Sequence, residues 1–202
     1  MQIRRKGTKN CMIRWVVGLL FGLVFILGLH YSGVVRFSFL ATPEEEIVWE
    51  PSPAPSLSLQ SIKGEKFELN QFQGKIVLLN FWATWCGPCL DEFPAFFKIA
   101  EEMNDRLVFI GISTDKDAKT IYDYFQKYLP QFQGQLDAKN FLIALDSDRK
   151  ISEGIFNVIR FPETIIIDPS GRMVRKIVGP SDWKDPKMKE YLVKLATAST
   201  SE

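Results

Sequence analysis

Apolar residues are arranged in two different ways along this chain. From Trp15 to Val35 they form one run of 21 residues without a formal charge. As a helix with a rise of about 1.5 Å per residue, this run is long enough to cross a bilayer. From Leu57 onwards the apolar residues come instead in short groups, separated by charged and turn-forming residues. This second pattern is typical of a folded domain built from strands and helices.

The short apolar groups predict the following order of elements. An alternating pattern around Lys63-Gly64 predicts a hairpin over residues 57–69. Nearly continuous apolar runs predict buried strands at 76–82, 107–112 and 141–145. Helices are expected at 86–103 (with a kink at Pro94), 117–129, 149–156 and 184–197. Two further segments, 163–168 and 172–178, flank a Pro-Ser-Gly turn and predict an antiparallel hairpin, and 131–140 is expected to be a loop.

Strands that alternate with helices and then end in a hairpin and a helix predict an α/β fold. We expect a central mixed sheet with helices on both faces, its first half parallel. The chain then divides into a basic tail (1–14), a membrane-spanning segment (15–35), a linker rich in Glu and Pro (36–56) and a folded domain (57–202).

Charge is divided unevenly along the chain. Residues 1–36 hold six basic residues and no acidic one, whereas the remainder holds 19 basic and 24 acidic residues. Basic residues before an apolar run favour the cytoplasmic side, so the domain is expected in the periplasm or another extracytoplasmic space, on a single-pass anchor. A cleaved signal peptide is the alternative, but no convincing small-x-small site or lipobox cysteine follows the run. The acidic domain has no evident reason to bind nucleic acid.

Two of the three cysteines form a Cys86-Gly87-Pro88-Cys89 motif between a predicted strand and a predicted helix. Unpaired N–H groups and the dipole at a helix N-terminus stabilise a thiolate, which can attack a disulfide. A domain with a single Cys-x-x-Cys pair and no other cysteine is not a small fold stabilised by several disulfides. A structural zinc site needs four ligands, and the other Cys and His residues are Cys11 and His30, both in the N-terminal segment. No metal site is therefore predicted.

The sequence around these cysteines resembles the thioredoxin superfamily, and more closely its membrane-anchored TlpA/ResA/CcmG branch. The resemblance is carried by residues 74–94, which include Asn80-Phe81-Trp82-Ala83-Thr84-Trp85 before the cysteines, and by Phe161-Pro162-Glu163-Thr164. It covers about residues 55–196. It implies a thioredoxin fold and a thiol:disulfide oxidoreductase whose redox group is its own disulfide, without another cofactor. Members of this branch usually reduce protein disulfides, for example those of apocytochrome c before haem attachment, and are recharged by a membrane thiol transporter.

The resemblance also assigns roles to residues. Cys86 is the expected nucleophile, Cys89 the resolving thiol, and Gly87-Pro88 tunes their potential. Glu92 is expected to exchange a proton with Cys89, unless it is an ordinary first-turn glutamate. Asn80 sharpens that choice, because thioredoxin has an aspartate in this strand whereas Asn80 cannot titrate.

Substrate binding is expected to involve Trp85, Phe161 and Pro162. The resemblance implies a cis bond before Pro162, which would present the Phe161 backbone to a peptide. Arg160 either steers acidic substrates or is a solvated loop charge. The apolar face of Phe93, Phe96 and Phe97 is expected to be core.

Two other activities remain open from the sequence. A thiol peroxidase would need a threonine and an arginine around the attacking cysteine, and no such signature precedes Cys86. A copper-handling module would use soft thiolates for Cu(I), but the predicted exported domain has no histidine to join them.

Overall fold

The computed structural model describes residues 50–198. The predicted basic tail, the membrane-spanning segment and most of the linker lie outside the described residues. Within residues 50–198 no helix is long and apolar enough to cross a membrane.

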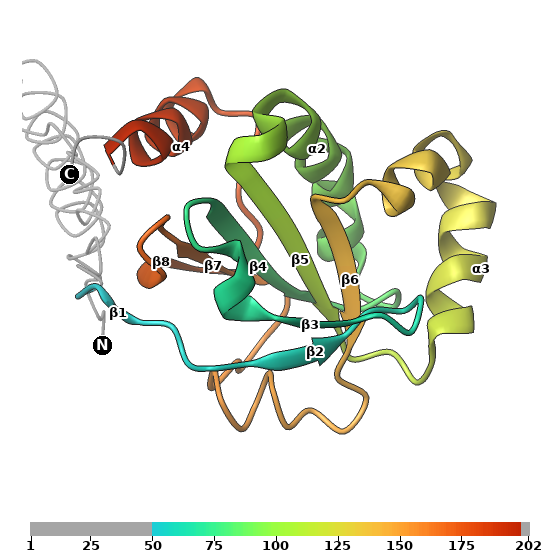
Figure 1. Cartoon of the computed structure of the whole chain (residues 1–202). Coiled ribbons are helices and arrows are strands. Elements are labelled where there is room, and N and C mark those ends of the chain that lie inside the picture. The colour runs from blue at the N-terminus through green and yellow to red at the C-terminus, as the bar shows by residue number, and fades with distance from the viewer. Residues whose placement is uncertain (1–49, 199–202) are drawn as a thin grey trace, which may run out of the picture. The chain divides into compact units, whose positions relative to one another are not determined.

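A six-stranded mixed sheet forms the centre of the domain (Figure 1). Its strands, in spatial order, are β1 (Ser52–Pro53), β8 (Arg172–Val178), β7 (Glu163–Ile167), β4 (Ile76–Trp82), β5 (Leu107–Ser113) and β6 (Phe141–Leu145). β4, β5 and β6 run parallel, and β7 is antiparallel to both β4 and β8. The predicted mixed sheet with a parallel half is therefore confirmed.

The sheet begins earlier in the chain than expected. Ser52 and Pro53, which we assigned to the linker, pair antiparallel with β8 as its edge strand. An edge strand tolerates proline because one side of it needs no backbone donor. The predicted hairpin is confirmed as β2 (Ser58–Gln60) and β3 (Lys66–Glu68), which pair with each other and are followed by the 3-10 helix η1 (Leu69–Phe72).

Three of the four predicted helices occur, with ends that differ slightly from the predicted ones. They are α2 (Gly87–Met103), α3 (Ala118–Tyr128) and α4 (Pro186–Ala198), with the short 3-10 helix η2 (Asn104–Arg106) after α2. α2 contains Pro94 and continues to Met103. The side chain of Asp117 caps α3 by accepting a hydrogen bond from Thr120 N at 2.9 Å. The expected loop 131–140 contains another 3-10 helix, η3 (Pro130–Asp137).

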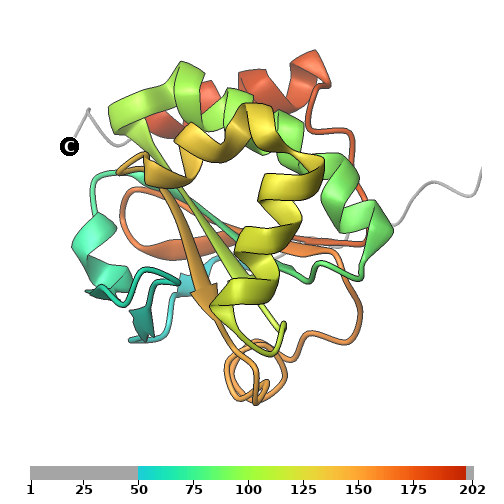
Figure 2. The same ribbon diagram turned by 90° about the vertical axis from the view of Figure 1, so that its right-hand side faces the viewer.

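Helices were expected on both faces of the sheet, but this prediction is wrong, because α2, α3 and α4 all lie on one face. Buried residues of α2, α3 and α4 all belong to one core, together with alternate residues of the strands such as Leu78 and Phe109. The residues between them on the strands, such as Leu79 and Ile110, pack against the β2–β3 hairpin, η1 and the segment 151–158. Figures 1 and 2 show the α-helices gathered on one side of the sheet and the hairpin on the other. The hairpin and loop bury the second face without an α-helix.

The predicted helix at 149–156 is also wrong, because this segment forms hydrogen-bonded turns. Arg149 adopts a left-handed φ of 57°. The Asp146 carboxylate accepts hydrogen bonds from Ile151 N and Ser152 N, at 3.0 and 2.7 Å. A side chain that takes up two backbone donors competes with helical hydrogen bonding and favours turns.

Aromatic rings fill the core beneath α2. Phe93 is fully buried, and its ring packs against Trp82 with centroids 4.4 Å apart and against Phe125 at 5.3 Å. Phe96 and Phe97 are buried in the same core, which confirms the expectation for this face. Gly111 leaves room for Trp82, since a Cβ atom there would lie 2.9 Å from Trp82 Nε1. The α2 helix is thus anchored to the sheet by ring packing.

Replacing Phe93 with Ala is expected to lower the free energy of unfolding by about 3–5 kcal/mol, because the lost ring leaves a cavity among other rings. Urea unfolding of the oxidised protein measures this change. Val193→Ala, at a position 36% exposed on α4, is the matched control and should change stability by less than about 0.5 kcal/mol. Similar losses for the two variants would contradict this account of the core.

Candidate active site

The end of β4 places the cysteine pair. All seven residues of β4 are buried, and the strand is paired on both edges, by β5 and β7. Cys86 follows this strand closely as the N-cap of α2, with extended backbone (φ −93°, ψ 95°), and its Sγ accepts a hydrogen bond from Cys89 N at 3.3 Å. Sulfur therefore occupies the N-cap position that oxygen usually takes. A thiolate there is favoured by the positive end of the helix.

Cys86 and Cys89 form a disulfide with an S–S distance of 2.03 Å. Cys86 is 6% exposed and Cys89 is 1% exposed, so Cys86 is the more accessible sulfur, as predicted. Gly87 and Pro88 are exposed beside it. Pro88 lies in the first turn of α2, where its missing N–H would have had no helical partner.

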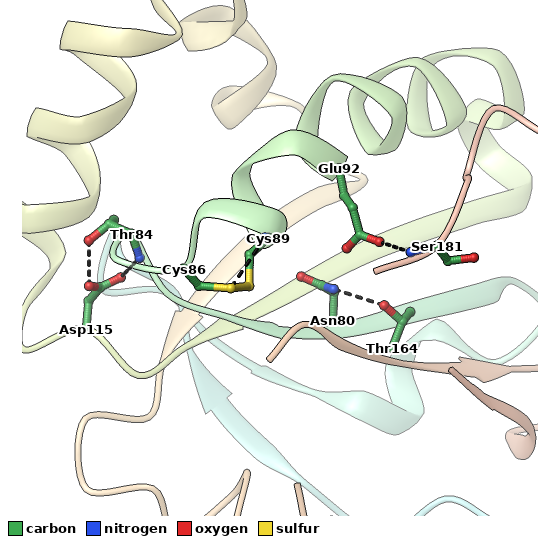
Figure 3. Close-up of a disulfide and its surroundings, with 8 residues drawn as sticks. All are labelled: Asn80, Thr84, Cys86, Cys89, Glu92, Asp115, Thr164 and Ser181. Atoms are coloured by element: carbon green, nitrogen blue, oxygen red, sulfur yellow. Dashed lines mark hydrogen bonds between the residues drawn. A yellow bond between two sulfur atoms is a disulfide. The ribbon is translucent and has the colours of Figure 1, made fainter. Parts of the chain in front are cut away.

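A buried carboxylate holds the loop before the cysteines. Asp115 is 4% exposed and accepts hydrogen bonds from Thr84 N at 2.9 Å, Thr84 Oγ1 at 2.7 Å and Ser113 Oγ at 2.6 Å (Figure 3). Asp115 follows β5, the parallel neighbour of β4, so both strands deliver these residues at the same edge of the sheet. Sequence analysis missed Asp115, although a polar residue at the carboxyl end of a parallel strand is a recognisable signal.

Glu92 lies one turn beyond Cys89 and is 6% exposed. Its Oε1 accepts hydrogen bonds from Ser181 N at 2.8 Å and from Trp183 Nε1 at 2.9 Å, whereas its buried Oε2 has no partner among the described residues. Burial raises the pKa of Glu92, and the bonds from Ser181 and Trp183 oppose that rise. Glu92 is thus a buried carboxyl group, not a solvated first-turn glutamate.

Asn80 faces Glu92 from β4. Figure 3 shows Glu92 descending from α2 and Asn80 rising from the strand, both on the same side of the disulfide. Asn80 is 1% exposed, and its Nδ2 donates a hydrogen bond to Thr164 Oγ1 at 2.9 Å. Its Oδ1 is buried without a partner among residues 50–198. Two oxygens without a partner among the described residues, one of them on a titratable group, therefore lie to one side of the cysteine pair.

A cavity opens beside Cys86. Its volume is about 400 Å³, and its lining comprises Trp85, Cys86, Gly87, Pro88, Arg149, Glu153 and residues 158–161. The rings of Trp85 and Phe161 lie 5.7 Å apart. The peptide bond before Pro162 is cis, as predicted. The structure thus brings Trp85 and Phe161 to Cys86, whereas Pro162 is buried and is not part of the cavity lining.

A second buried carboxylate follows the cis bond and was not singled out in sequence analysis. Glu163 is fully buried, and Lys176 Nζ lies 2.6 Å from its Oε1. The same ammonium group donates a hydrogen bond to the Phe156 carbonyl oxygen at 3.1 Å. Burial raises the pKa of Glu163, and Lys176 opposes that rise. Lys176 thereby joins the start of β7 to the segment that carries the cavity wall.

Comparisons with known proteins agree with this geometry. Residues 50–192 match the family model described as Redoxin. Two relatives from Bacillus subtilis are the thioredoxin-like protein YneN (32% identical, covering 87% of this chain and 96% of that protein) and the thiol-disulfide oxidoreductase ResA (31% identical, covering 86% and 88%). Among solved structures, a thioredoxin-family thiol:disulfide interchange protein from Chlorobium tepidum is similar in fold, with a TM-score of 0.58, 24% identity and coverage of 73% and 98%. The exposed lipoprotein thioredoxin of Streptococcus pneumoniae has a TM-score of 0.55, 24% identity and coverage of 70% and 100%.

The thioredoxin-like sheet, the Cys-x-x-Cys pair at a helix N-terminus and these relatives together define a thiol-disulfide oxidoreductase of the ResA type. The chain belongs to the redoxin family. The resemblance to the thioredoxin superfamily is therefore confirmed.

The buried Glu92 predicts a pH dependence of stability. The folded state raises the pKa of this carboxyl above the ordinary value of 4.5, so it binds the proton more tightly than the unfolded chain does. Stability from this group is full below pH 4.5 and is lost as pH rises through the folded pKa, by about 1.4 kcal/mol for each pH unit between the two pKa values.

Glu92→Gln retains an oxygen for Ser181 and Trp183 but cannot titrate. Relative to this variant, the wild-type protein should lose stability as the pH rises from 4.5 through the folded pKa of Glu92, in urea unfolding of the oxidised form. Glu101→Gln, an exposed position on the same helix, serves as control. A stability difference that stays constant over this range would show that Glu92 has an ordinary pKa.

Proposed function

We propose that this chain is a membrane-anchored, extracytoplasmic reductase of protein disulfides. The observation that carries the proposal is the Cys86–Cys89 pair at the N-terminus of α2, which opens on a cavity on one side and lies near the buried Glu92 on the other. Residues 15–35 would span the membrane, with residues 1–14 in the cytoplasm. The match to YneN supports a shared N-terminal segment, since it covers 87% of this chain, more than residues 50–202 alone supply.

The reaction begins with the reduced pair. The Cys86 thiolate attacks one sulfur of a client disulfide, a bond forms between Cys86 and the client, and the second client sulfur leaves as a thiolate that takes up a proton. Cys89 then loses its proton and attacks Cys86 Sγ, which releases the first client sulfur as a thiolate that is protonated in turn. The client gains two electrons and two protons, and the protein is left with the Cys86–Cys89 disulfide.

Glu92 is proposed to accept the proton of Cys89. A carboxylate with a raised pKa takes up a proton closer to neutral pH than an ordinary glutamate does. Its Oε2 has no partner among the described residues and is therefore available for a proton, whereas Oε1 already accepts two hydrogen bonds. The strand position at which thioredoxin has an aspartate is occupied here by Asn80, which cannot titrate. Glu92 therefore has no titratable neighbour at that position of β4.

The partners follow from the same proposal. Clients are protein disulfides, and the cysteines of apocytochrome c are the expected example. The oxidised pair must be reduced again by a dithiol donor, and an exported domain would receive these electrons from a membrane thiol transporter. Trp85 and Phe161 line the cavity and would form the surface against which the client lies, and the buried Pro162 would take part through its cis bond, which orients the Phe161 backbone.

The direction of electron flow can be measured. The Gly87-Pro88 dipeptide matches that of thioredoxin, so the reduction potential of the Cys86–Cys89 couple should be about −270 mV, at the reducing end of the known range. Equilibration with glutathione or dithiothreitol gives this value. A potential near −120 mV, typical of a strong oxidant, would contradict the assignment as a reductase.

Cys89→Ser should trap clients, because the mixed disulfide on Cys86 can no longer be resolved. Client proteins recovered from membranes under non-reducing conditions identify the substrates, with Cys86→Ser/Cys89→Ser as the control that captures none. Apocytochrome c among the captured proteins would support the maturation role. A broad set of exported proteins without cytochromes would point to a general reductase.

Glu92→Gln should slow resolution of the mixed disulfide by about 10²-fold or more, the usual contribution of a positioned base. In the wild-type protein this rate should rise with pH through the pKa of Glu92, and the variant should lack that limb. Release of a fluorescent peptide from Cys86 in a single turnover reports the step, with Glu101→Gln as control. An unchanged rate in the Glu92 variant would remove this residue from the mechanism.

A further inference from the structure

The two most exposed large apolar side chains of residues 50–198 lie at the same cavity. Ile159 is 82% exposed and Trp85 is 63% exposed, and both line the cavity beside Cys86. Removing such side chains from water is favourable, and apolar groups gathered at one hollow are characteristic of an interaction site. The lining of the cavity beside Cys86 therefore includes two exposed apolar side chains.

The charges at this cavity are only partly balanced. Arg149 and Glu153 both line it, and they neutralise each other through an Arg149 Nη1 to Glu153 Oε1 contact of 3.0 Å. Arg160 lines it too, and its charge opposes the rise in the pKa of the buried Glu163, but no carboxylate of the described residues lies within salt-bridge distance of its guanidinium group. The nearby Glu163 is already paired with Lys176. One guanidinium group, a strong and planar binder of carboxylates, is thus left for a ligand.

We propose that Ile159 and Arg160 select the client of this enzyme. The segment bound beside Cys86 would carry an apolar side chain, which packs between Trp85 and Ile159, and a carboxylate, which pairs with Arg160, on residues flanking the reacting cysteine. This inference rests on the proposed reductase function and assigns it a substrate class: disulfides in acidic, apolar sequence surroundings. Arg160 is thereby given a binding role in place of that of a solvated charge.

The selection can be tested with the reduced full-length protein in detergent. Two synthetic peptides share one internal Cys-Ser-Ser-Cys disulfide, flanked in one by Leu and Asp and in the other by Ser and Lys. We expect kcat/KM for the Leu/Asp peptide to exceed that for the Ser/Lys peptide by about tenfold or more, the range that one pocket contact provides. Reduction of a small aromatic disulfide reports thiol exchange without peptide recognition.

Variants separate the two contacts. Arg160→Glu should make a Leu/Lys peptide a better substrate than the Leu/Asp peptide, and such a reversal cannot arise from misfolding. Ile159→Ser should remove the preference for Leu over Ser beside the same carboxylate. The matched controls are Val193→Ser and Arg106→Glu, both of which should keep the wild-type preference. Arg106 directly precedes β5, whose first residue pairs with Ile76 at the end of β4 opposite to Cys86.

The outcomes of these experiments test client selection separately from the proposed reductase function. Equal rates for the two peptides, or an unchanged preference in Arg160→Glu, would overturn the selection while small-disulfide reduction still supports the reductase. Failure of the wild-type protein to reduce any disulfide would overturn the proposed function itself. Self-association that is lost in Ile159→Ser, with unchanged peptide preference, would assign the exposed apolar side chains to a second copy of the chain and contradict client selection.

Discussion

The burial of β4 on both faces and both edges is the constraint on which the rest of this domain depends. Its seven residues pair with β5 and β7 while α-helices cover one face and the β2–β3 hairpin helps to cover the other. The strand can neither slip nor tilt without exposing apolar side chains on two sides. The chain therefore leaves the sheet at a fixed point, and Cys86 is held at the N-terminus of α2. The ring packing of Phe93 secures that helix from below.

Three buried carboxylates surround this point, and their environments differ in an informative way. Asp115 accepts hydrogen bonds from Thr84 and Ser113 on both of its carboxylate oxygens, and Glu163 has a cationic partner in Lys176. Glu92 has neutral donors on one oxygen and none from the described residues on the other. Burial favours the neutral form most in a carboxylate that has neither a cationic partner nor hydrogen-bond donors on both oxygens. Among these three carboxylates Glu92 alone combines the two conditions, which supports its proposed role as the proton acceptor for Cys89.

The cavity relates this interior chemistry to the surface. Its inner limit is Cys86, and its outer walls carry the exposed Trp85 and Ile159. Lys176 holds the segment leading to one wall, and Asp115 holds the loop leading to the other. Both walls therefore rest on buried polar contacts that a client need not disturb. A rigid site of this kind loses little ordering entropy when a peptide binds.

Much of this protein is determined by its sequence. The apolar runs located the strands and the cysteine spacing indicated the redox pair, whereas the cis bond before Pro162 and the proposed role of Glu92 came from the family resemblance. The strands and the redox pair depend on residues close together in the chain, where periodicity and helix-end chemistry act. The tertiary structure decided what lies across the sheet. It replaced the expected helix at 149–156 by turns, placed the α-helices on one face, and brought Asp115, Trp183 and Lys176 to the site. Sequence patterns cannot supply these pairings, because each joins side chains from different elements whose meeting depends on how the whole sheet packs.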